Sequence, residues 1–550
     1  MHVVENKSKQ GKKIFSSTLL RESYREGGKV KKRTVANISH CSLEEIEAIK
    51  FALKNKKRIK ELEQAGKIKY KQGQSFGAVY VIHEIAKRIG IADVLGNDRQ
   101  GKLALWQVIA RVIDQGSCLS ATRLASKMAA VEVVGFQRKF TEDSLYENLK
   151  WVTENQKKIE EKLFKKRRKS KPDLFLYDVT SSYLEGAKNE LAAWGYNRDG
   201  KKGKKQIVAG LLCDDKGVPV SIEIFPGSTS DTKTFSNQIK KTAKDFGCQR
   251  VTFVGDRGMI KSKQIEELQE QEFHYITGIT KPQICKLIRT GVFQLELFEI
   301  NLCEVEYEGE RYILRYNPVR AEEMKVVRLE KQKTLNKLIK IKNEYLKIHP
   351  RAKIEVALKN VNCKIKQLKA NKWLYVEEKE KQIVLQIDKT KLDKEEELDG
   401  CYCLKTDLPS TISKDKVHDR YKDLALVEQA FRISKTINLE MRPWYVIKEQ
   451  SSRGRALIIM LAYMIIQELQ TLWGNLNATV EESIDSLATL CTLEIHAKRK
   501  APCYQIPEPN KFNEKLLNEA KIILPSFFPK SNIKIVTRKQ LPDCRKSQTE

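Results

Sequence analysis

The 550-residue sequence predicts an α/β fold, in which helices cover the faces of a mixed sheet. Five short runs rich in β-branched and aromatic residues follow Pro172, as is typical of strands. The first three runs are separated by turns or loops alone, whereas helical patterns surround the fourth. The expected strands are 173–180, 206–214, 218–225, 250–256 and 273–279, and the expected helices are 231–245 and 260–271.

The order of these elements is that of a ribonuclease H-like core, in which the first and fourth strands lie side by side. We expect residues 169–282 to form the first part of this core and residues 409–475 to complete it. The second part begins with a helix at about 415–437, and an apolar helix over 456–473 is expected beneath it. The longest apolar run, "ALIIMLAYMII", has eleven residues, which is too short to cross a bilayer and indicates a buried core helix.

A mainly helical N-terminal region is expected before the core. Residues 1–72 are expected to form a basic β-hairpin turned at Gly27–Gly28, followed by a charged helix. A capping box, in which Ser42 is followed by Glu45, opens that helix. Residues 73–168 show short helical patterns broken at glycines, and we expect a helical DNA-binding region that presents a helix to a groove.

Residues 283–408 are expected to interrupt the core as an insertion of strands and Lys-rich helices. The helices at 321–347 and 352–371 have the pattern of a coiled-coil hairpin, although their charge density is equally typical of a solvated pair of helices. Both alternatives stay open. The basic C-terminal region, 476–550, is polar with scattered prolines, and we expect it to be loosely ordered or to cross over a partner.

The charge of the chain predicts a polyanionic partner. The 102 Lys and Arg residues against 71 Asp and Glu residues give a formal net charge of +31, spread over the whole length. Nucleic acid is therefore the expected partner. The twelve cysteines include no C-x-x-C pair, which argues against a zinc site and indicates reduced thiols. The first residues lack the apolar segment of a signal peptide, so we expect a cytoplasmic protein without a membrane partner.

Two carboxylates end strands that the predicted order places side by side. "LFLYDVTSS" ends its apolar run on Asp178, and "VTFVGDRGM" ends its run on Asp256. Carboxylates held a few ångströms apart repel each other, so the arrangement favours shared cations. Mg²⁺ suits it, because two such ions roughly 3.5–4 Å apart stabilise both oxygens of an in-line displacement. A single strand-end Asp is most often a turn former or helix cap, and only the joint pattern favours catalysis.

A third ligand is expected on the helix "YKDLALVEQAFRISKT", which follows the insertion. Tyr421, Glu428 and Lys435 are seven residues apart, so they project from one stripe of a helix. Arg432, four residues after Glu428, lies close to that stripe. The stripe offers a carboxylate between a phenol and an ammonium, which suits a metal ligand between two phosphate contacts.

An aromatic and basic loop follows the first Asp. It contains Trp194, Tyr196, Arg198 and Lys201–Lys205, and it leaves the sheet near the proposed metals. We interpret it as a DNA contact, and a solvated hairpin is the alternative.

The sequence resembles the D-D-E transposases of bacterial insertion sequences. The segments "YDVTSSYLEG" and "GDRGM" and the pattern Y-x₆-E-x₆-K are similar to the insertion-sequence-four superfamily, whose signature is Tyr-Arg-Glu-Lys around the last carboxylate. "ESYREGGKVKKRTVANIS", "GYNRDGKKGKKQIVAGLLCD" and "ELDGCYCLKTD" resemble the branch named for insertion sequence sixteen-thirty-four. The resemblance covers most of residues 20–470.

The resemblance implies a ribonuclease H-like catalytic core with a β-rich insertion. It makes Asp178, Asp256 and Glu428 the catalytic metal ligands, and Tyr421 and Lys435 the contacts to the phosphates beside the cut. Two Mg²⁺ ions, for which Mn²⁺ can substitute, are the implied cofactors. The implied partners are the inverted-repeat ends and the target, both double-stranded DNA, which a homodimer bridges on the bacterial nucleoid.

The sequence departs from the signature at one position, where the signature Arg is replaced by Leu424. Leu cannot bind a phosphate, and Arg432, Arg420 and Arg257 are the neighbouring residues that could replace the missing Arg. In relatives, a Trp of the insertion can stack on a base flipped from a hairpin end, which singles out Trp373. A strand aromatic in a small hydrophobic cluster is the alternative.

The sequence therefore predicts a Mg²⁺-dependent DNA transposase that hydrolyses a phosphodiester at each element end and joins the freed 3′-OH to target DNA. One alternative is a two-metal endonuclease that cuts without strand transfer. The other is a transposase-derived DNA-binding protein that is catalytically weakened or dead, which Leu424 keeps open and the intact carboxylates argue against.

Overall fold

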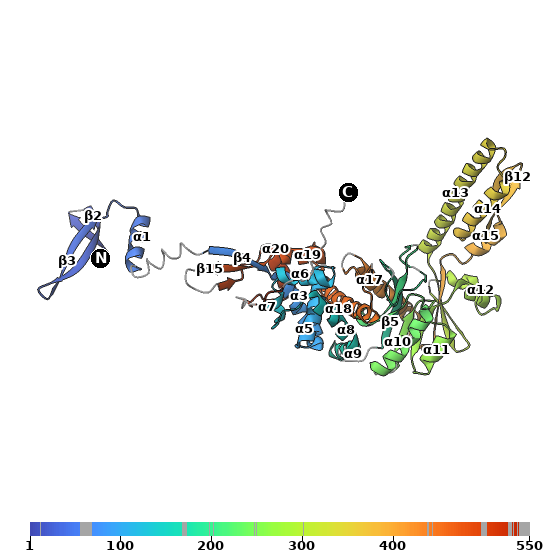
Figure 1. Ribbon diagram of the computed structural model, residues 1–550, viewed down its shortest axis with the longest axis horizontal. Coiled ribbons are helices and arrows are strands. Elements are labelled where there is room, and N and C mark those ends of the chain that lie inside the picture. The colour runs from blue at the N-terminus through green and yellow to red at the C-terminus, as the bar shows by residue number, and fades with distance from the viewer. Residues whose placement is uncertain are drawn as a thin grey trace.

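A computed structural model of the protein describes most of the chain (Figure 1). The described residues are 1–10, 13–55, 69–167, 173–186, 188–196, 198–201, 203–246, 248, 250–300, 302–436, 439–442, 444–496, 503–525, 531, 533–535 and 537.

An eight-stranded mixed sheet forms the centre of the described structure. In sheet order its strands are β10 (Cys303–Tyr307), β11 (Glu310–Tyr316), β14 (Cys401–Thr406), β9 (His274–Gly278), β8 (Thr252–Gly255), β5 (Leu174–Tyr183), β6 (Gln206–Asp214) and β7 (Pro219–Pro226). β5, β8 and β9 are parallel neighbours, and the other pairs are antiparallel. The expected mixed α/β fold is confirmed, and the five predicted strands lie in the predicted order.

Helices cover both faces of this sheet. They include α10 (Asp231–Asp245), α11 (Ser262–Gln269), α16 (Lys414–Lys422), α17 (Leu424–Lys435) and α18 (Glu449–Trp473).

Alternate side chains of β5 enter two separate cores. Phe175 and Tyr177 pack in one core with Phe235 of α10. Leu174 and Leu176 face the opposite way, into a larger core that includes α17 and α18. Because successive strand residues point to opposite faces, β5 is buried on both sides and its register is fixed.

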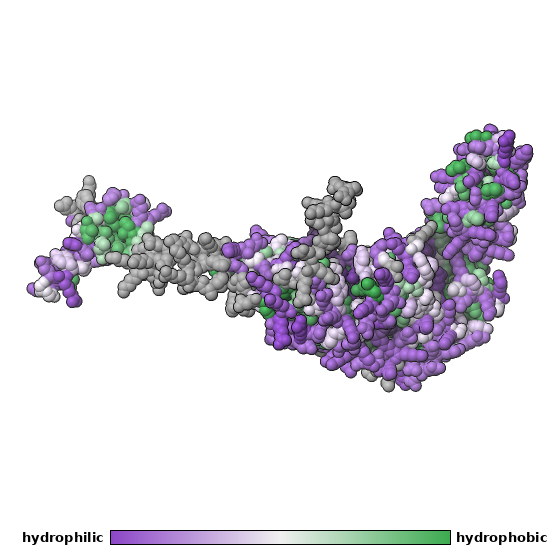
Figure 2. Space-filling model, in the orientation of Figure 1, coloured by the Kyte–Doolittle hydropathy of each residue, from purple (hydrophilic) through white to green (hydrophobic). Residues whose placement is uncertain are grey.

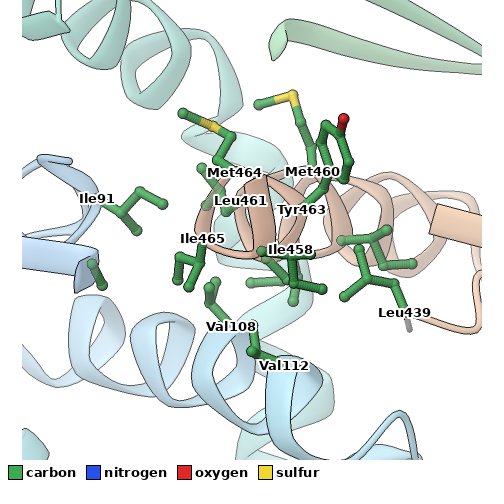
Figure 3. Close-up of a cluster of buried hydrophobic side chains, with 14 of the residues drawn as sticks. Ile91, Val108, Val112, Leu439, Ile458, Met460, Leu461, Tyr463, Met464 and Ile465 are labelled. Carbon is green, nitrogen blue, oxygen red and sulfur yellow. The ribbon is translucent and has the colours of Figure 1, made fainter. Parts of the chain in front are cut away.

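α18 is the central helix of the larger core. Figure 3 shows Ile458, Leu461 and Ile465 of this helix close to Val108 and Val112. α18 contacts β7 and α17 on one side and N-terminal helices on the other, so it joins the two parts of the molecule. Among the described helices it alone is long and apolar enough to cross a membrane, but 72% of its apolar window is buried inside the protein. The prediction of a buried core helix agrees with this burial.

The chain begins with strands, so the expectation of a mainly helical N-terminal region is not confirmed. The first elements are β1 (His2–Gln10), β2 (Lys13–Glu26), β3 (Lys29–Asn37) and α1 (Leu43–Lys54). The expected hairpin turns at Gly27–Gly28, and β1 adds a third strand beside β2. β1 has few apolar residues, so its sequence gives a weak strand signal, and pairing with β2 supplies its hydrogen bonds. α1 opens with the expected capping box of Ser42 and Glu45, whereas residues 56–68 of the predicted helix lie outside the described residues.

Residues 77–167 form the helices that surround α18. They are α3 (Gly77–Arg88), α4 (Ile91–Leu95), α5 (Arg99–Ile113), α6 (Cys118–Lys127), α7 (Ala130–Val134), α8 (Glu142–Glu154) and α9 (Gln156–Arg167). α5 and α8 make close contacts with α18 and with each other. The apolar faces of these helices therefore belong to the same core as the sheet.

The C-terminal region is folded where it is described, which corrects the expectation of loose order. Its elements are α19 (Val480–Ala488), β15 (Cys491–His496), β16 (Cys503–Gln505) and α20 (Lys511–Glu519). β15 pairs with β4 (Lys69–Ser75), and Leu516 of α20 is fully buried in the larger core. The prediction weighed the polar composition and missed the few apolar residues that fix this region. Residues 538–550 lie outside the described part.

The insertion contributes to two structures. β10, β11 and β14 extend the central sheet beyond β9, and the rest forms an arm that projects from the body (Figure 1). The arm has a core of its own, in which α13 and α14 pack against β12 and β13. It is therefore neither a free coiled-coil hairpin nor a solvated helix pair. The remaining elements of the insertion are α12 (Lys281–Arg289), η1 (Leu295–Phe298), α13 (Pro318–Ile348), α14 (Ile354–Gln367), β12 (Leu374–Lys379), β13 (Gln382–Ile387) and α15 (Lys389–Glu396).

Hydrophilic residues cover most of the face seen in Figure 2, including much of the arm. This surface agrees with the excess of Lys and Arg over the whole length.

The crossing of α18 over α8 gives a stability prediction. A Cβ at Gly454 would lie 2.1 Å from the backbone oxygen of Leu149, which cannot move without shifting α8. Gly454→Ala should therefore destabilise the protein by about 1–3 kcal/mol, although alanine favours a helix interior over glycine by about 1 kcal/mol. Urea unfolding of the full chain measures this change. Gln450→Ala, at an exposed position one turn earlier, is the matched control, and equal midpoints for the two variants would contradict the close crossing.

Candidate active site

Asp178 lies inside β5, which stays paired with β6 as far as Tyr183, so the prediction that it ends its strand is wrong. Asp256 directly follows β8, as predicted, and the two residues stand at corresponding positions of the β5–β8 pair. Leu176 pairs with Val254, and each Asp lies two residues further along its chain. Adjacent strands lie roughly 4.8 Å apart, so the two carboxyl groups leave the sheet at the same edge. Each Oδ1 accepts a hydrogen bond from the next backbone amide, from Val179 at 2.7 Å and from Arg257 at 2.7 Å.

Glu428 lies on α17, which packs across β5 and β6. Val427, Ala430 and Phe431 are buried and fix the helix on the sheet, whereas Glu428 is on the exposed side. The packing of an amphipathic helix thus sets the place of the third carboxylate.

The predicted single helix over 415–437 is divided into α16 and α17 at Asp423, which corrects the prediction of one continuous stripe. The amide of Leu426 donates to the Asp423 carbonyl at 2.9 Å, a tighter turn than that of an α-helix. Tyr421 therefore lies on a separate helix, where its phenol is near enough to Asp256 for the charge of that carboxylate to act on it. Burial, together with the Asp256 charge, raises the pKa of Tyr421 above its usual value, so the phenol keeps its proton.

The three acids influence one another electrostatically. Burial raises the pKa of Asp178 to about 7, and the charges of Glu428 and Asp256 add to the rise. The Val179 amide and the Arg198 guanidinium oppose it. An acid with this pKa holds its proton more readily than an ordinary Asp, unless a cation compensates the charge.

The carboxylate set suits a hard divalent cation, because Mg²⁺ prefers carboxylate oxygens. As they stand, the side chains do not form a closed site: among the described residues, no three His, Cys, Asp or Glu side chains are grouped closely enough to hold a metal ion. Repulsion between like charges favours such separated positions. The three carboxylates fit the ion by their chemistry, and their positions on β5, after β8 and on α17 bring them to one region of the sheet.

Sequence reasoning missed an ion-pair cluster beside these acids. The Asp199 carboxylate contacts Lys435 at 2.8 Å and Arg442 at 2.7 Å. Arg198 contacts Asp231 at 2.7 Å. Burial lowers the pKa of Lys435, and Asp199 opposes that change. Asp199, Asp231 and Arg442 give no local sequence signal, because their partners lie far away along the chain.

The other arginines predicted to contact DNA differ in their exposure and in their neighbours. Arg432 and Arg257 are exposed, and Arg257 adjoins Asp256. Leu424 packs against the larger core. The position that carries Arg in the family signature therefore has a packing role in this chain. A guanidinium nitrogen of Arg420 lies 4.0 Å from a carboxylate oxygen of Asp173, which is a long distance for an ion pair.

Trp373 is only 5% exposed and packs in the core of the arm, so the prediction that it stacks on a DNA base is wrong. In the aromatic and basic loop, Trp194 and Tyr196 are 63% and 83% exposed, and Lys202 lies outside the described residues.

Comparisons with known proteins match these regions. The family model described as Transposase DDE domain matches residues 169–465, more than half of the chain. The model described as IS1634 family transposase, N-terminal domain, matches residues 2–66. No curated protein matches significantly.

Two solved structures are similar to the chain. One is the piggyBac transposase synaptic complex with hairpin DNA, at 9% identity over 70% of this chain and 69% of that chain, with a TM-score of 0.34. The other is the Mos1 transposase paired-end complex with left transposon end, at 13% identity over 32% of this chain and 58% of that chain, with a TM-score of 0.14.

The raised pKa of Asp178 gives a prediction about stability and pH. The folded state holds the Asp178 proton up to about pH 7, whereas an ordinary Asp loses it near 3.8, so the wild type loses stability as the pH rises between these values. Without divalent cations, Asp178→Asn should be more stable than the wild type at pH 8, by up to about 4 kcal/mol, and the difference should vanish toward pH 4. Urea unfolding in EDTA at several pH values measures it. A less stable variant at pH 8, or a difference that does not change with pH, would contradict this electrostatic account.

Proposed function

The chain belongs to the DDE transposases of the IS1634 family, and we propose that it is a Mg²⁺-dependent enzyme that binds the terminal inverted repeats of its element. It hydrolyses a phosphodiester at each end and then joins the freed 3′-OH to target DNA. It acts in the cytoplasm on the nucleoid, as a homodimer, because two ends must be held for one joining event. The observation that supports the proposal most is the parallel pairing of β5 with β8, which brings Asp178 and Asp256 to one level of the sheet, with Glu428 on α17, the helix that packs on β5.

Asp178, Asp256 and Glu428 are the residues that hold the ions in this proposal. Bound Mg²⁺ supplies Lewis-acid stabilisation to the attacking and leaving oxygens of the phosphate. Asp178 gives up its proton when the ions bind, since a nearby cation favours the charged carboxylate. Tyr421 lies beside Asp256 and keeps its own proton.

The DNA contacts of the proposal are cationic side chains around this edge of the sheet. Arg198 acts electrostatically on Asp178 and on Lys435, and Arg257 and Arg432 are exposed neighbours of Asp256 and Glu428 in the sequence. Contacts of this kind release counterions from DNA, so binding should weaken steeply with salt. The ribonuclease H-like order of the sheet suits this chemistry, because the pairing of β5 with β8 brings two carboxylates to one level of the sheet.

Leu424 favours one second candidate, a transposase-derived protein that binds DNA but cuts it weakly or not at all. The residue is part of the core packing and offers no phosphate contact. A two-metal endonuclease that cuts without joining is the other alternative to be separated by experiment.

The test is a cleavage and strand-transfer assay with duplex DNA that carries the inverted repeats flanking the gene. The wild type with Mg²⁺ should cut the ends and join them to a target plasmid, and EDTA should abolish both products. Asp178→Asn, Asp256→Asn and Glu428→Gln should each lower cleavage by at least about a hundredfold, because each removes a ligand of an ion that stabilises the transition state.

Asp173→Asn is the matched control, since Asp173 is an exposed carboxylate at the other end of β5 and should leave cleavage unchanged. Full activity in any of the three acid variants would refute the assignment of the site. Cleavage without joining would identify an endonuclease, and binding without cleavage would identify the inactive DNA-binding protein.

A further inference from the structure

One buried carboxylate joins two regions that lie far apart in the sequence, around β5 and around the end of α17. The Asp199 side chain is only 2% exposed, and its Oδ1 accepts hydrogen bonds from Lys435 at 2.8 Å and Arg442 at 2.7 Å. Its Oδ2 accepts the backbone amide of Tyr183 at 3.2 Å. The loop after β5, the last turn of α17 and the segment after α17 are thereby held together.

This cluster has more positive than negative charge. Lys435 and Arg442 share one carboxylate, so the group carries a net charge of about +1 in a partly buried place. The Arg442 side chain is 34% exposed, which leaves part of its guanidinium open to solvent. A guanidinium has several N–H donors, and a carboxylate uses only some of them.

Arg198 connects the cluster to the acids. Its backbone amide donates to Ser181 at 2.8 Å, and its guanidinium is held by both oxygens of Asp231. From this position it acts electrostatically on both Asp178 and Lys435. Arg198 is therefore electrostatically coupled both to a proposed metal ligand and to the cations held by Asp199.

We infer that Asp199 is a positioning residue, which holds Lys435 and Arg442 as a preformed pair of cations for a DNA phosphate that neighbours the bond to be cut. The inference rests on the proposed function. Lys435 is seven residues after Glu428 on α17, a rise of roughly 10 Å, so the pair meets a neighbouring phosphate and not the scissile one. Arg442 thus becomes an additional phosphate contact in a chain that has Leu424 at the signature Arg position.

Removing the Asp199 charge should disturb the pair in a specific way. Asp199→Asn keeps the size of the side chain but leaves two cations facing each other without a countercharge. Burial and the charges of Arg442 and Arg198 already lower the pKa of Lys435, and Asp199 is the group that opposes them. Without it, the two cations separate or Lys435 loses its proton, and the phosphate contact is lost in either case.

The experiment compares DNA ends that carry a single neutral methylphosphonate, moved through the positions around the cut, with unmodified ends. For the wild type, a methylphosphonate at one position next to the cut should lower kcat/KM about tenfold, because a charge-assisted contact to that phosphate is lost. The Asp199→Asn variant should have an about tenfold lower kcat/KM on unmodified DNA. A methylphosphonate at that same position should then lower its kcat/KM no further. The Lys435→Met and Arg442→Met variants should also show no further fall of kcat/KM with a methylphosphonate at that position. These two variants test the inference if Asp199→Asn fails to fold.

Asp245→Asn is the matched control, because Asp245 is a largely buried carboxylate that pairs with Lys157 on the other side of the sheet. It should keep the full methylphosphonate response of the wild type. Variants of the cluster that respond to every methylphosphonate as the wild type does would overturn the inference. Failure of the wild type itself to cut unmodified ends would instead reject the proposed function.

Discussion

The parallel pairing of β5 with β8 is the constraint on which the candidate site depends. The register that pairs Leu176 with Val254 places Asp178 and Asp256 at one level of the sheet. A slip of one residue would turn one carboxylate to the opposite face, and burial of β5 on both sides prevents it. α18 packs between the sheet and the N-terminal helices, and its contacts with β7 and α17 stabilise this arrangement. The stability of the fold and the geometry of the acids are therefore set by the same contacts.

Two groups of side chains with opposite charge lie in this region of the sheet. Asp178, Asp256 and Glu428 carry like charges, and burial adds to the strain on Asp178. A short distance away, Lys435, Arg442 and Arg198 are cations held by Asp199 and Asp231. In the proposed function, an Mg²⁺ ion would offset the charge of the first group and a DNA phosphate would offset that of the second, so both groups suit a substrate that arrives with its metal ions. The proposed function accounts for both groups.

The sequence predicted the elements whose signals are local and missed those that depend on distant partners. β6 and α10 were predicted at their observed bounds, because β-branched runs and helical periodicity are properties of neighbouring residues. The division of α16 from α17 was missed, since "YKDLALVEQ" contains neither Gly nor Pro. β10, β11 and β14 were predicted as strands, but their addition to the central sheet depends on pairing with β9, which no local pattern reveals. In the site, Asp199 was read as part of a basic loop, and Trp373 was assigned to DNA although it fills the core of the arm.

The most direct test of this account is to locate the metal ions by anomalous scattering. Crystals of the chain with end DNA and Mn²⁺, measured near the manganese absorption edge, would show where the ions bind. The account predicts anomalous peaks between the carboxylates of Asp178, Asp256 and Glu428, beside a DNA phosphate. Manganese bound elsewhere, or a protein–DNA complex in which these three carboxylates hold no ion, would contradict it.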